Sequence, residues 1–141
     1  MPNVALDLPW PPADLNPNRA RGLHWATRRE ATALYRRDCF VVARDMINRA
    51  GRIKAPVPTP VPTPVSATVT FWMPDRRRRD LDNLLAAMKP AWDGLVDAGL
   101  LADDNADQLS ITLKPPEYAG GRGAAGVHLV LAYKGRDDDQ D

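Results

Sequence analysis

Polar and apolar residues alternate in four short runs, the pattern expected of β-strands that bury one face. The runs are NVALDLP (3–9), VSATVTFW (65–72), QLSITLK (108–114) and GVHLVLAYK (126–134). In the first run Val4, Leu6 and Leu8 share a face, and the prolines of PWPP (9–12) end the strand because proline cannot donate to a ladder. The second run predicts a buried face of Val65, Ala67, Val69 and Phe71.

The segment after Trp25 predicts a long helix. Thr27 and Glu30 form a T-x-x-E capping box, and the helical pattern runs to about Ala50, where Gly51 is placed to close it. The apolar residues that recur at helical spacing predict its buried stripe, which comprises Leu34, Tyr35, Cys39, Val42 and Met46.

A second helix is predicted over residues 83–98. Its apolar positions are Leu84, Met88, Leu95 and Ala98. Asp82 or Asn83 is placed to cap its start, and Gly99 to end it. Pro90 predicts a kink, because proline removes a donor and crowds the preceding turn. The expected order of elements is therefore strand, helix, strand, helix, strand, strand.

The proline-rich segment 55–64 contains the tandem VPTPVPTP and has neither helix nor ladder potential. We interpret it as an extended, polyproline-like connector, with a ligand for an SH3-type module as the alternative. One domain is expected over residues 1–134, since a chain of 141 residues can bury a sizeable core without disulfides or metals. Residues 135–141 form an acidic tail that is predicted to be disordered.

Composition narrows the functional classes only in part. Hydrophobic residues make up 44% of the chain and the net charge is +1, values typical of a soluble globular protein. No apolar run approaches the ~20 residues needed to span a bilayer and no signal peptide is apparent, so a cytoplasmic protein with no membrane partner is expected. The lone Cys39 excludes an intramolecular disulfide and, among apolar neighbours, is predicted to be a buried, inert thiol.

The chemistry concentrates in residues 73–108, where four arginines, Arg76 to Arg79, precede Asp80 and Asp82. In an extended conformation two aspartates spaced by two residues point the same way, as ligands of one hard cation would. Arginines suit phosphate recognition because guanidinium groups bind phosphate through two parallel hydrogen bonds. Arg19 and Arg21 add positive charge near the N-terminus and are further candidates for DNA contact. The alternative is a helix cap beside a solvated charged run.

Four segments resemble the RusA family of Holliday-junction resolvases: LPWPP (8–12), MPDRRRRDLDNL (73–84), DGLVDAGLLADD (93–104) and Gln108. The resemblance implies a small α+β domain with a mixed sheet, working as an intertwined homodimer on four-way junctions and other branched DNA. It implies a phage-type, Mg²⁺-dependent endonuclease of recombination and repair. Its catalytic and metal-binding residues would be Asp80, Asp82 and Asp104, with Asp103 in the adjacent acidic position.

Lys89 is a further candidate for catalysis. Members of the family often carry a lysine four residues after the second aspartate, where this chain has Ala86. Lys89 lies seven residues after Asp82, and offsets of four and seven return near the same helix face. Lys89 either neutralises charge at the reacting phosphate or is a solvated surface lysine. His24 and His128 are expected to be structural or surface residues. A catalytically idle branched-DNA-binding protein and a proline-repeat interaction module are the alternative functions.

Overall fold

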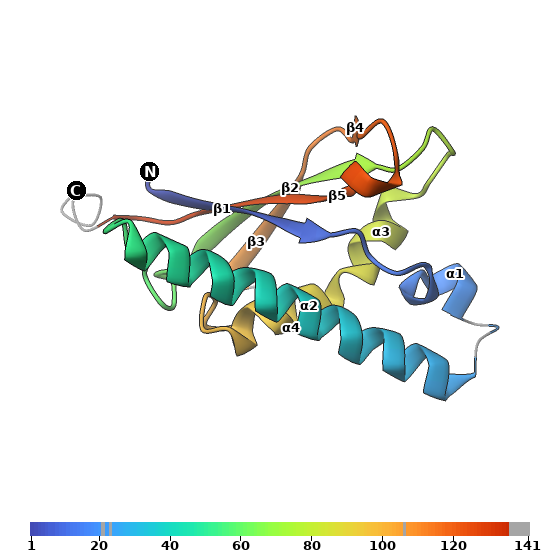
Figure 1. Ribbon diagram of the computed structural model, residues 1–141, viewed down its shortest axis with the longest axis horizontal. Helices are drawn as coiled ribbons and strands as arrows, with labels where there is room; N and C mark the ends of the chain where they lie inside the picture. The colour runs from blue at the N-terminus through green and yellow to red at the C-terminus, as the bar shows by residue number, and fades with distance from the viewer. Residues whose placement is uncertain (21, 23, 106, 136–141) are drawn as a thin grey trace.

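A computed structural model describes residues 1–20, 22, 24–105 and 107–135. It is a small α+β domain in which one mixed sheet is covered on one face by helices, as Figure 1 shows. The strands are β1 (Asn3–Pro9), β2 (Val65–Met73), β3 (Leu109–Leu113), β4 (Glu117–Tyr118) and β5 (Gly126–Ala132). The helices are α1 (Pro17–Ala20), α2 (Trp25–Arg52), α3 (Leu81–Ala87) and α4 (Lys89–Asp97), with short 3₁₀ turns η1 (Ala13–Leu15) and η2 (Arg122–Ala124).

The sheet has the order β1-β5-β2-β3, and β4 pairs with the far end of β2. β5 lies antiparallel between β1 and β2, whereas β3 and β4 run parallel to β2. The parallel β2–β3 pair requires a crossover, and α3 with α4 supplies it. This crossover carries the segment 73–108 in which the candidate chemistry lies.

Strand alternation is confirmed by the burial pattern. Val4, Leu6 and Leu8 are buried on β1, and the four predicted core residues of β2 are all at most 2% exposed. The opposite face of the sheet holds the polar row Asp7, His128 and Thr70, which are direct neighbours on β1, β5 and β2. The apolar face packs against α2 and α4 and forms the core.

The start and the buried stripe of α2 differ from the prediction. The T-x-x-E box is not its cap: α2 begins at Trp25, and the Nδ1 of His24 accepts a hydrogen bond from the Ala26 N–H at 3.2 Å. Tyr35 and Cys39 are buried as predicted, but Leu34 is 51% exposed. The buried line is spaced by four residues, so Leu34, about 100° from Tyr35 around the helix, faces away from it.

The single helix predicted over 83–98 is two helices that meet at Met88. Proline cannot donate to the Ala86 carbonyl, so Pro90 ends one helix and occupies the first turn of the next, where a missing N–H costs nothing. The break replaces the predicted kink. Gly99 follows α4 with a φ of +83°, a conformation that suits glycine.

Short elements also interrupt the predicted order. η1 and α1 precede the long helix, and β4 and η2 lie between the predicted strands 108–114 and 126–134. The proline-rich segment 55–64 connects α2 to β2 without helix or strand, as predicted, but it is anchored to the domain. Val61 is fully buried and its N–H donates to the Leu100 carbonyl at 2.9 Å. None of the described helices is long and apolar enough to cross a membrane, and residues 136–141 of the acidic tail lie outside the described residues.

Candidate functional site

The two aspartates of the D-x-D segment have different local roles. Asp80 is the N-cap of α3, and its Oδ1 accepts a hydrogen bond from the Asp82 N–H at 2.8 Å. The cap is therefore Asp80 rather than Asp82 or Asn83. Asp82 lies in the first helical turn, where its charge is favourable beside the free N–H groups. Because Asp82 is helical, the expectation that both carboxylates project from one extended strand does not describe the segment.

Asp82 lines a cavity together with two other candidate residues. This acidic cavity has a volume of about 490 Å³ and lies where α3, α4, the loop after α4 and β3 meet. Its lining comprises Asp82, Leu85, Ala86, Lys89, Trp92, Asp104 and Ile111. Three residues from separate positions in the chain, Asp82, Lys89 and Asp104, thus converge on one space. Asp80 is not among its lining residues.

Lys89 is the positive group of the acidic cavity. It is the first residue of α4, and its Nζ donates to the Asp104 carboxylate and, at 3.2 Å, to Oδ1 of Asp93. The hydrogen bond from Lys89 lowers the pKa of Asp104, and the same bond raises the pKa of Lys89. Both groups are consequently charged at neutral pH. Ala86, at the position where the family often has a lysine, lines the same cavity, so Lys89 reaches this space from the next helix.

Asp103 serves the loop rather than the cavity. Its Oδ1 accepts from the Asp104 N–H at 2.7 Å and its Oδ2 accepts from the Asn105 side chain at 3.1 Å. Within the described residues no group of three or more His, Cys, Asp or Glu side chains is arranged to hold a metal ion. Metal binding by Asp80, Asp82 and Asp104 therefore stays a prediction. The donor set suits Mg²⁺ nonetheless, because this ion needs only one or two carboxylates besides water and phosphate oxygens.

The four arginines before α3 are not equivalent, and Asp75 explains the difference. Arg79 forms two hydrogen bonds to the Asp75 carboxylate, at 2.8 and 3.1 Å, and its side chain is only 18% exposed. Arg77 donates to the same carboxylate through its backbone N–H at 2.9 Å and, more weakly, through its side chain. Hydrogen bonding from Arg79, and then from Arg77, holds the pKa of Asp75 well below its usual range. Asp75 thus fixes the shape of the loop 74–80, which we call the arginine loop.

The remaining arginines have looser surroundings. The Arg76 guanidinium lies 4.3 Å from the ring centre of Tyr118 on β4, a cation–π contact. Arg78 has neither an ion pair nor a side-chain hydrogen bond with any described residue, so its charge is available for a ligand. Arg19 donates to Asp14 at 3.1 Å. Arg21 lies outside the described residues.

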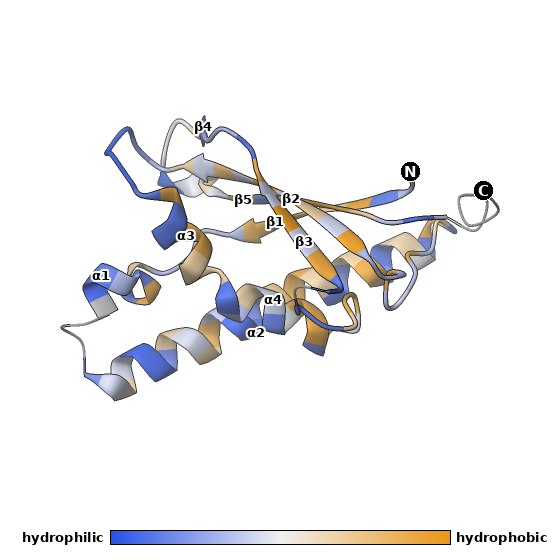
Figure 2. Ribbon diagram, turned by 180° about the vertical axis from the view of Figure 1, so that it is seen from behind, coloured by the Kyte–Doolittle hydropathy of each residue, from blue (hydrophilic) through white to orange (hydrophobic). Residues whose placement is uncertain are grey.

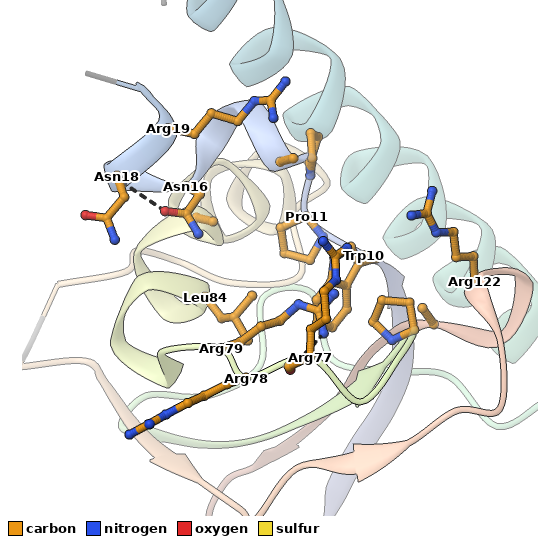
Figure 3. A pocket seen from close by; sticks show the side chains of 15 residues that line it. Trp10, Pro11, Asn16, Asn18, Arg19, Arg77, Arg78, Arg79, Leu84 and Arg122 are labelled. Carbon is orange, nitrogen blue, oxygen red and sulfur yellow. Dashed lines mark hydrogen bonds between the residues drawn. The ribbon is translucent and has the colours of Figure 1, made fainter. Parts of the chain in front are cut away.

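Arg77, Arg78 and Arg79 line a second cavity, the arginine pocket, with a volume of about 590 Å³. Arg19 and Arg122 join them from other segments, and no described Asp or Glu side chain is part of the lining. The Arg79 guanidinium lies 5.6 Å from the Trp10 ring centre, and Figure 3 shows Arg78 extending away from that ring. The full lining is Trp10, Pro11, Pro12, Ala13, Asn16, Asn18, Arg19, Pro74, Arg77, Arg78, Arg79, Leu84, Ala87, Arg122 and Ala125.

Sequence reasoning missed several members of this pocket. Trp10 belongs to the LPWPP segment, and Arg122 lies in a glycine-rich loop with no helical or strand pattern. Only the fold brings them to Arg77 and Arg79, because β1 and β5 deliver these loops to the same end of the sheet. Figure 2 shows that the loop before α3 is among the most hydrophilic parts of this end.

Helix α3 separates the two cavities. Leu84 and Ala87 line the arginine pocket, whereas Asp82, Leu85 and Ala86 line the acidic cavity. At ~100° per residue these two sets occupy opposite faces of the helix. The loop 74–80 leads into the N-terminus of α3, so the arginines of this loop approach the aspartates at the start of the helix.

The two histidines have structural contacts. His24 caps α2, and Nδ1 of His128 lies 2.7 Å from Oδ1 of Asp7 on the open face of the sheet. Neither lines the acidic cavity or the arginine pocket.

Comparison with known proteins then decides the family. No family model matches the chain. It is 36% identical over 140 residues to the crossover junction endodeoxyribonuclease RusA of Escherichia coli (strain K12), covering 97% of this chain and all of that protein. The chain belongs to the RusA family. The RusA of Shigella sonnei is 34% identical over the same shares of both chains, and an uncharacterized protein of Xylella fastidiosa is 40% identical over 92% of this chain and 88% of its own.

The RusA-like segments form the site described above. Segment 73–84 supplies the arginine loop and the start of α3, and segment 93–104 supplies most of α4 with the loop that carries Asp104. The LPWPP segment supplies the Trp10 wall of the arginine pocket. The segments that resemble the family therefore include residues that line both cavities.

Proposed function

We propose that this protein is an endodeoxyribonuclease that resolves four-way DNA junctions by hydrolysing phosphodiester bonds, with Mg²⁺ as cofactor. One observation carries the proposal: Asp82, Asp104 and Lys89 converge on the acidic cavity, and an arginine pocket lies across α3 from it. Carboxylates for a metal and guanidinium groups for a phosphate backbone are the two requirements of such a nuclease. Membership of the RusA family supports junction DNA as the substrate.

Each charged side chain of the acidic cavity then has a task. Asp82 and Asp104 would hold Mg²⁺, with the cap residue Asp80 nearby, and the ion would polarise the scissile phosphate, lower the pKa of the attacking water and stabilise the leaving oxygen. Lys89 keeps Asp104 ionised, and its ammonium group is positioned to offset negative charge on the phosphate. Water adds to phosphorus as one P–O bond breaks, so no protein nucleophile is needed.

The arginines would bind the phosphate backbone of the DNA. Arg78, without an anionic partner among the described residues, and the partly paired Arg77 would contact phosphates, while Asp75 holds Arg79 in the wall of the pocket. Most of the affinity for branched DNA would be electrostatic and would fall with salt.

Two symmetric cuts resolve a junction, so we also propose a homodimer that presents two identical sites. The expected setting, the cytoplasm of a host carrying a phage or prophage, follows from the family resemblance. A proline-repeat interaction module is disfavoured because buried Val61 ties the repeat to the domain.

The test incubates purified protein with a fluorescently labelled synthetic four-way junction and with a linear duplex of the same sequence, each with and without Mg²⁺. We expect paired nicks in the junction that require Mg²⁺ and little cutting of the duplex. Junction binding without cleavage at any divalent metal concentration would favour the catalytically idle DNA-binding protein instead.

A further inference from the structure

The arginine pocket is larger than recognition of a phosphate requires. Its volume of about 590 Å³ equals that of roughly 20 liquid waters at ~30 Å³ each, far more than one phosphate group fills. The value also falls within the ~300–1,000 Å³ range of pockets that enclose whole small molecules. Its ligand should therefore include more than the backbone.

One side of the pocket is formed by the Trp10 indole and the Arg79 guanidinium. Trp10 and the fully buried Phe71 form a T-shaped ring contact, with ring centres 6.0 Å apart and planes at 77°. Arg79, held by Asp75, places its guanidinium 5.6 Å from the Trp10 ring centre. Pro11 and Pro74 extend this wall. Planar guanidinium and indole groups are the surfaces on which unstacked nucleic-acid bases lie.

The rim of the pocket is polar and positively charged. Arg77 is 73% exposed, and Arg78 and Arg122 form no ion pair with any described residue. Asn16 uses its Oδ1 to accept the Asn18 N–H at 2.9 Å, which leaves its amide NH₂ as a donor. Figure 3 shows that the Asn16 side chain lies across the pocket from Trp10.

An indole and a guanidinium group behind a cationic rim match a nucleotide rather than intact duplex. Duplex DNA presents phosphates outward but keeps its bases stacked, so a pocket beside the backbone gains no base contact from it. At a branch point a base can leave the stack at lower cost. We propose that the arginine pocket holds one unpaired nucleotide of a junction strand, with its phosphate on Arg77 and Arg78 and its base against the wall of Trp10 and Arg79. The inference rests on the proposed function and adds a base-binding subsite to it.

The experiment scans one strand of a labelled, non-migrating four-way junction with a single abasic residue moved across the branch point. Affinities are measured by fluorescence anisotropy in EDTA, so that no cleavage occurs. The wild-type protein is expected to bind at least fivefold more weakly when the abasic residue stands at one particular position. Trp10→Ala should bind the intact junction at least fivefold more weakly, and its affinity should not depend on the position of the abasic residue. Trp10→Phe should restore both the affinity and this position dependence.

Trp25→Ala is the matched control, because Trp25 is 67% exposed and lines neither cavity; it should reproduce the wild-type scan. Equal affinity of the wild-type protein for every abasic junction would overturn the inference and leave a phosphate-binding surface. That scan needs no variant, so misfolding of Trp10→Ala would not weaken it. Failure to bind any junction would instead refute the proposed function.

Discussion

At the scale of single residues, the pair Lys89–Asp104 carries the most specific claim about chemistry. Lys89 Nζ contacts the carboxylates of Asp104 and Asp93 at the edge of the acidic cavity. The Lys89 side chain is 64% exposed, so its ammonium group is accessible to a phosphate that enters the cavity and can offset charge that develops on it.

Replacing Lys89 with Ala is therefore expected to lower the rate of junction cleavage at least tenfold while junction affinity stays within about twofold. Single-turnover cleavage at saturating protein and Mg²⁺ measures this rate directly. Lys54→Ala and Lys134→Ala are the controls, because both lysines are exposed and line neither cavity. A Lys89→Ala rate equal to that of the wild type would remove Lys89 from the reaction.

Asp75 allows a prediction about pH. Its hydrogen bonds to Arg79 and Arg77 lower its pKa in the folded state. A carboxyl with a lowered folded-state pKa stabilises the protein above its unfolded pKa of ~3.9, and this stability is lost as pH falls toward the folded-state value. The wild type should thus be more stable than Asp75→Asn from pH 7 to pH 5, with a difference that shrinks below pH ~4.

Urea unfolding followed by tryptophan fluorescence at several pH values measures the free energy of unfolding for both proteins. Asp45→Asn, which removes an exposed ion pair with Arg49 on α2, is the matched control and should have a smaller effect. A difference between wild type and Asp75→Asn that persists unchanged at pH 3 would contradict the role given to the Asp75 carboxylate.

The sequence predicted which residues would converge at the site better than it predicted the role of each residue. Asp82, Lys89 and Asp104 converge, but the cap turned out to be Asp80, and the arginine run divides according to Asp75, which no motif singled out. Which guanidinium group is paired with Asp75 and which is unpaired depends on the conformation of the folded loop. Spacing alone cannot show this, because Trp10 and Tyr118 reach the arginines through distant segments.

At the scale of elements, α2 and α4 pack tightly against one another at Gly94. A Cβ there would overlap the carbonyl oxygen of Arg36 and lie 3.0 Å from the Phe40 nitrogen, so backbone would have to move. Correct placement of α4 also positions Lys89 at its first residue. The close helix contact therefore supports the geometry of the acidic cavity.

Gly94→Ala is expected to destabilise the protein by roughly 1–3 kcal/mol, the usual cost of overpacking. Gly51→Ala is a matched control, because Gly51 is also helical but has no atom within 4 Å of the added Cβ. That substitution should be neutral or stabilise by about 0.5–1 kcal/mol. Urea midpoints measure both, and equal effects of the two substitutions would argue against the tight α2–α4 packing.

Strands proved easier to predict than helix ends. Alternation located the four longer strands, and β1, β2 and β5 each bury one face. On β3 Leu109 is buried but Ile111 is 39% exposed, and the two-residue β4 went unnoticed within a loop. The start of α2 was missed because a histidine cap has a weaker signature than the T-x-x-E box nearby. Pro90 was identified as a disruption, but whether it bends or ends a helix depends on packing around Met88, which is fully buried.

At the scale of the whole molecule, paired cleavage requires two active sites. β3 lies at one edge of the sheet, and its Ile111 is 39% exposed while also lining the acidic cavity. An open strand edge and an exposed apolar side chain beside the site favour association there.

The protein should therefore sediment as a dimer at micromolar concentration in analytical ultracentrifugation. Ile111→Lys should shift it toward monomer while leaving the circular dichroism spectrum unchanged, whereas Val41→Lys, on the exposed face of α2, should not. Monomeric wild-type protein that still makes paired cuts would contradict the two-site arrangement.

The two sides of α3 are expected to have separate roles, with DNA cleavage at the acidic cavity and DNA binding at the arginine pocket. Measuring junction affinity and cleavage rate side by side for Asp82→Asn and for the double variant Arg77→Ala, Arg78→Ala tests this most directly. Asp82→Asn should cut at least 100-fold more slowly yet bind as tightly as the wild type or more tightly. The double variant should bind more weakly, with a salt dependence flatter by roughly one unit of slope for each phosphate that it no longer neutralises, and should still cut what it binds. Loss of binding and cleavage together in Asp82→Asn would contradict the account and leave Asp82 with a structural role alone.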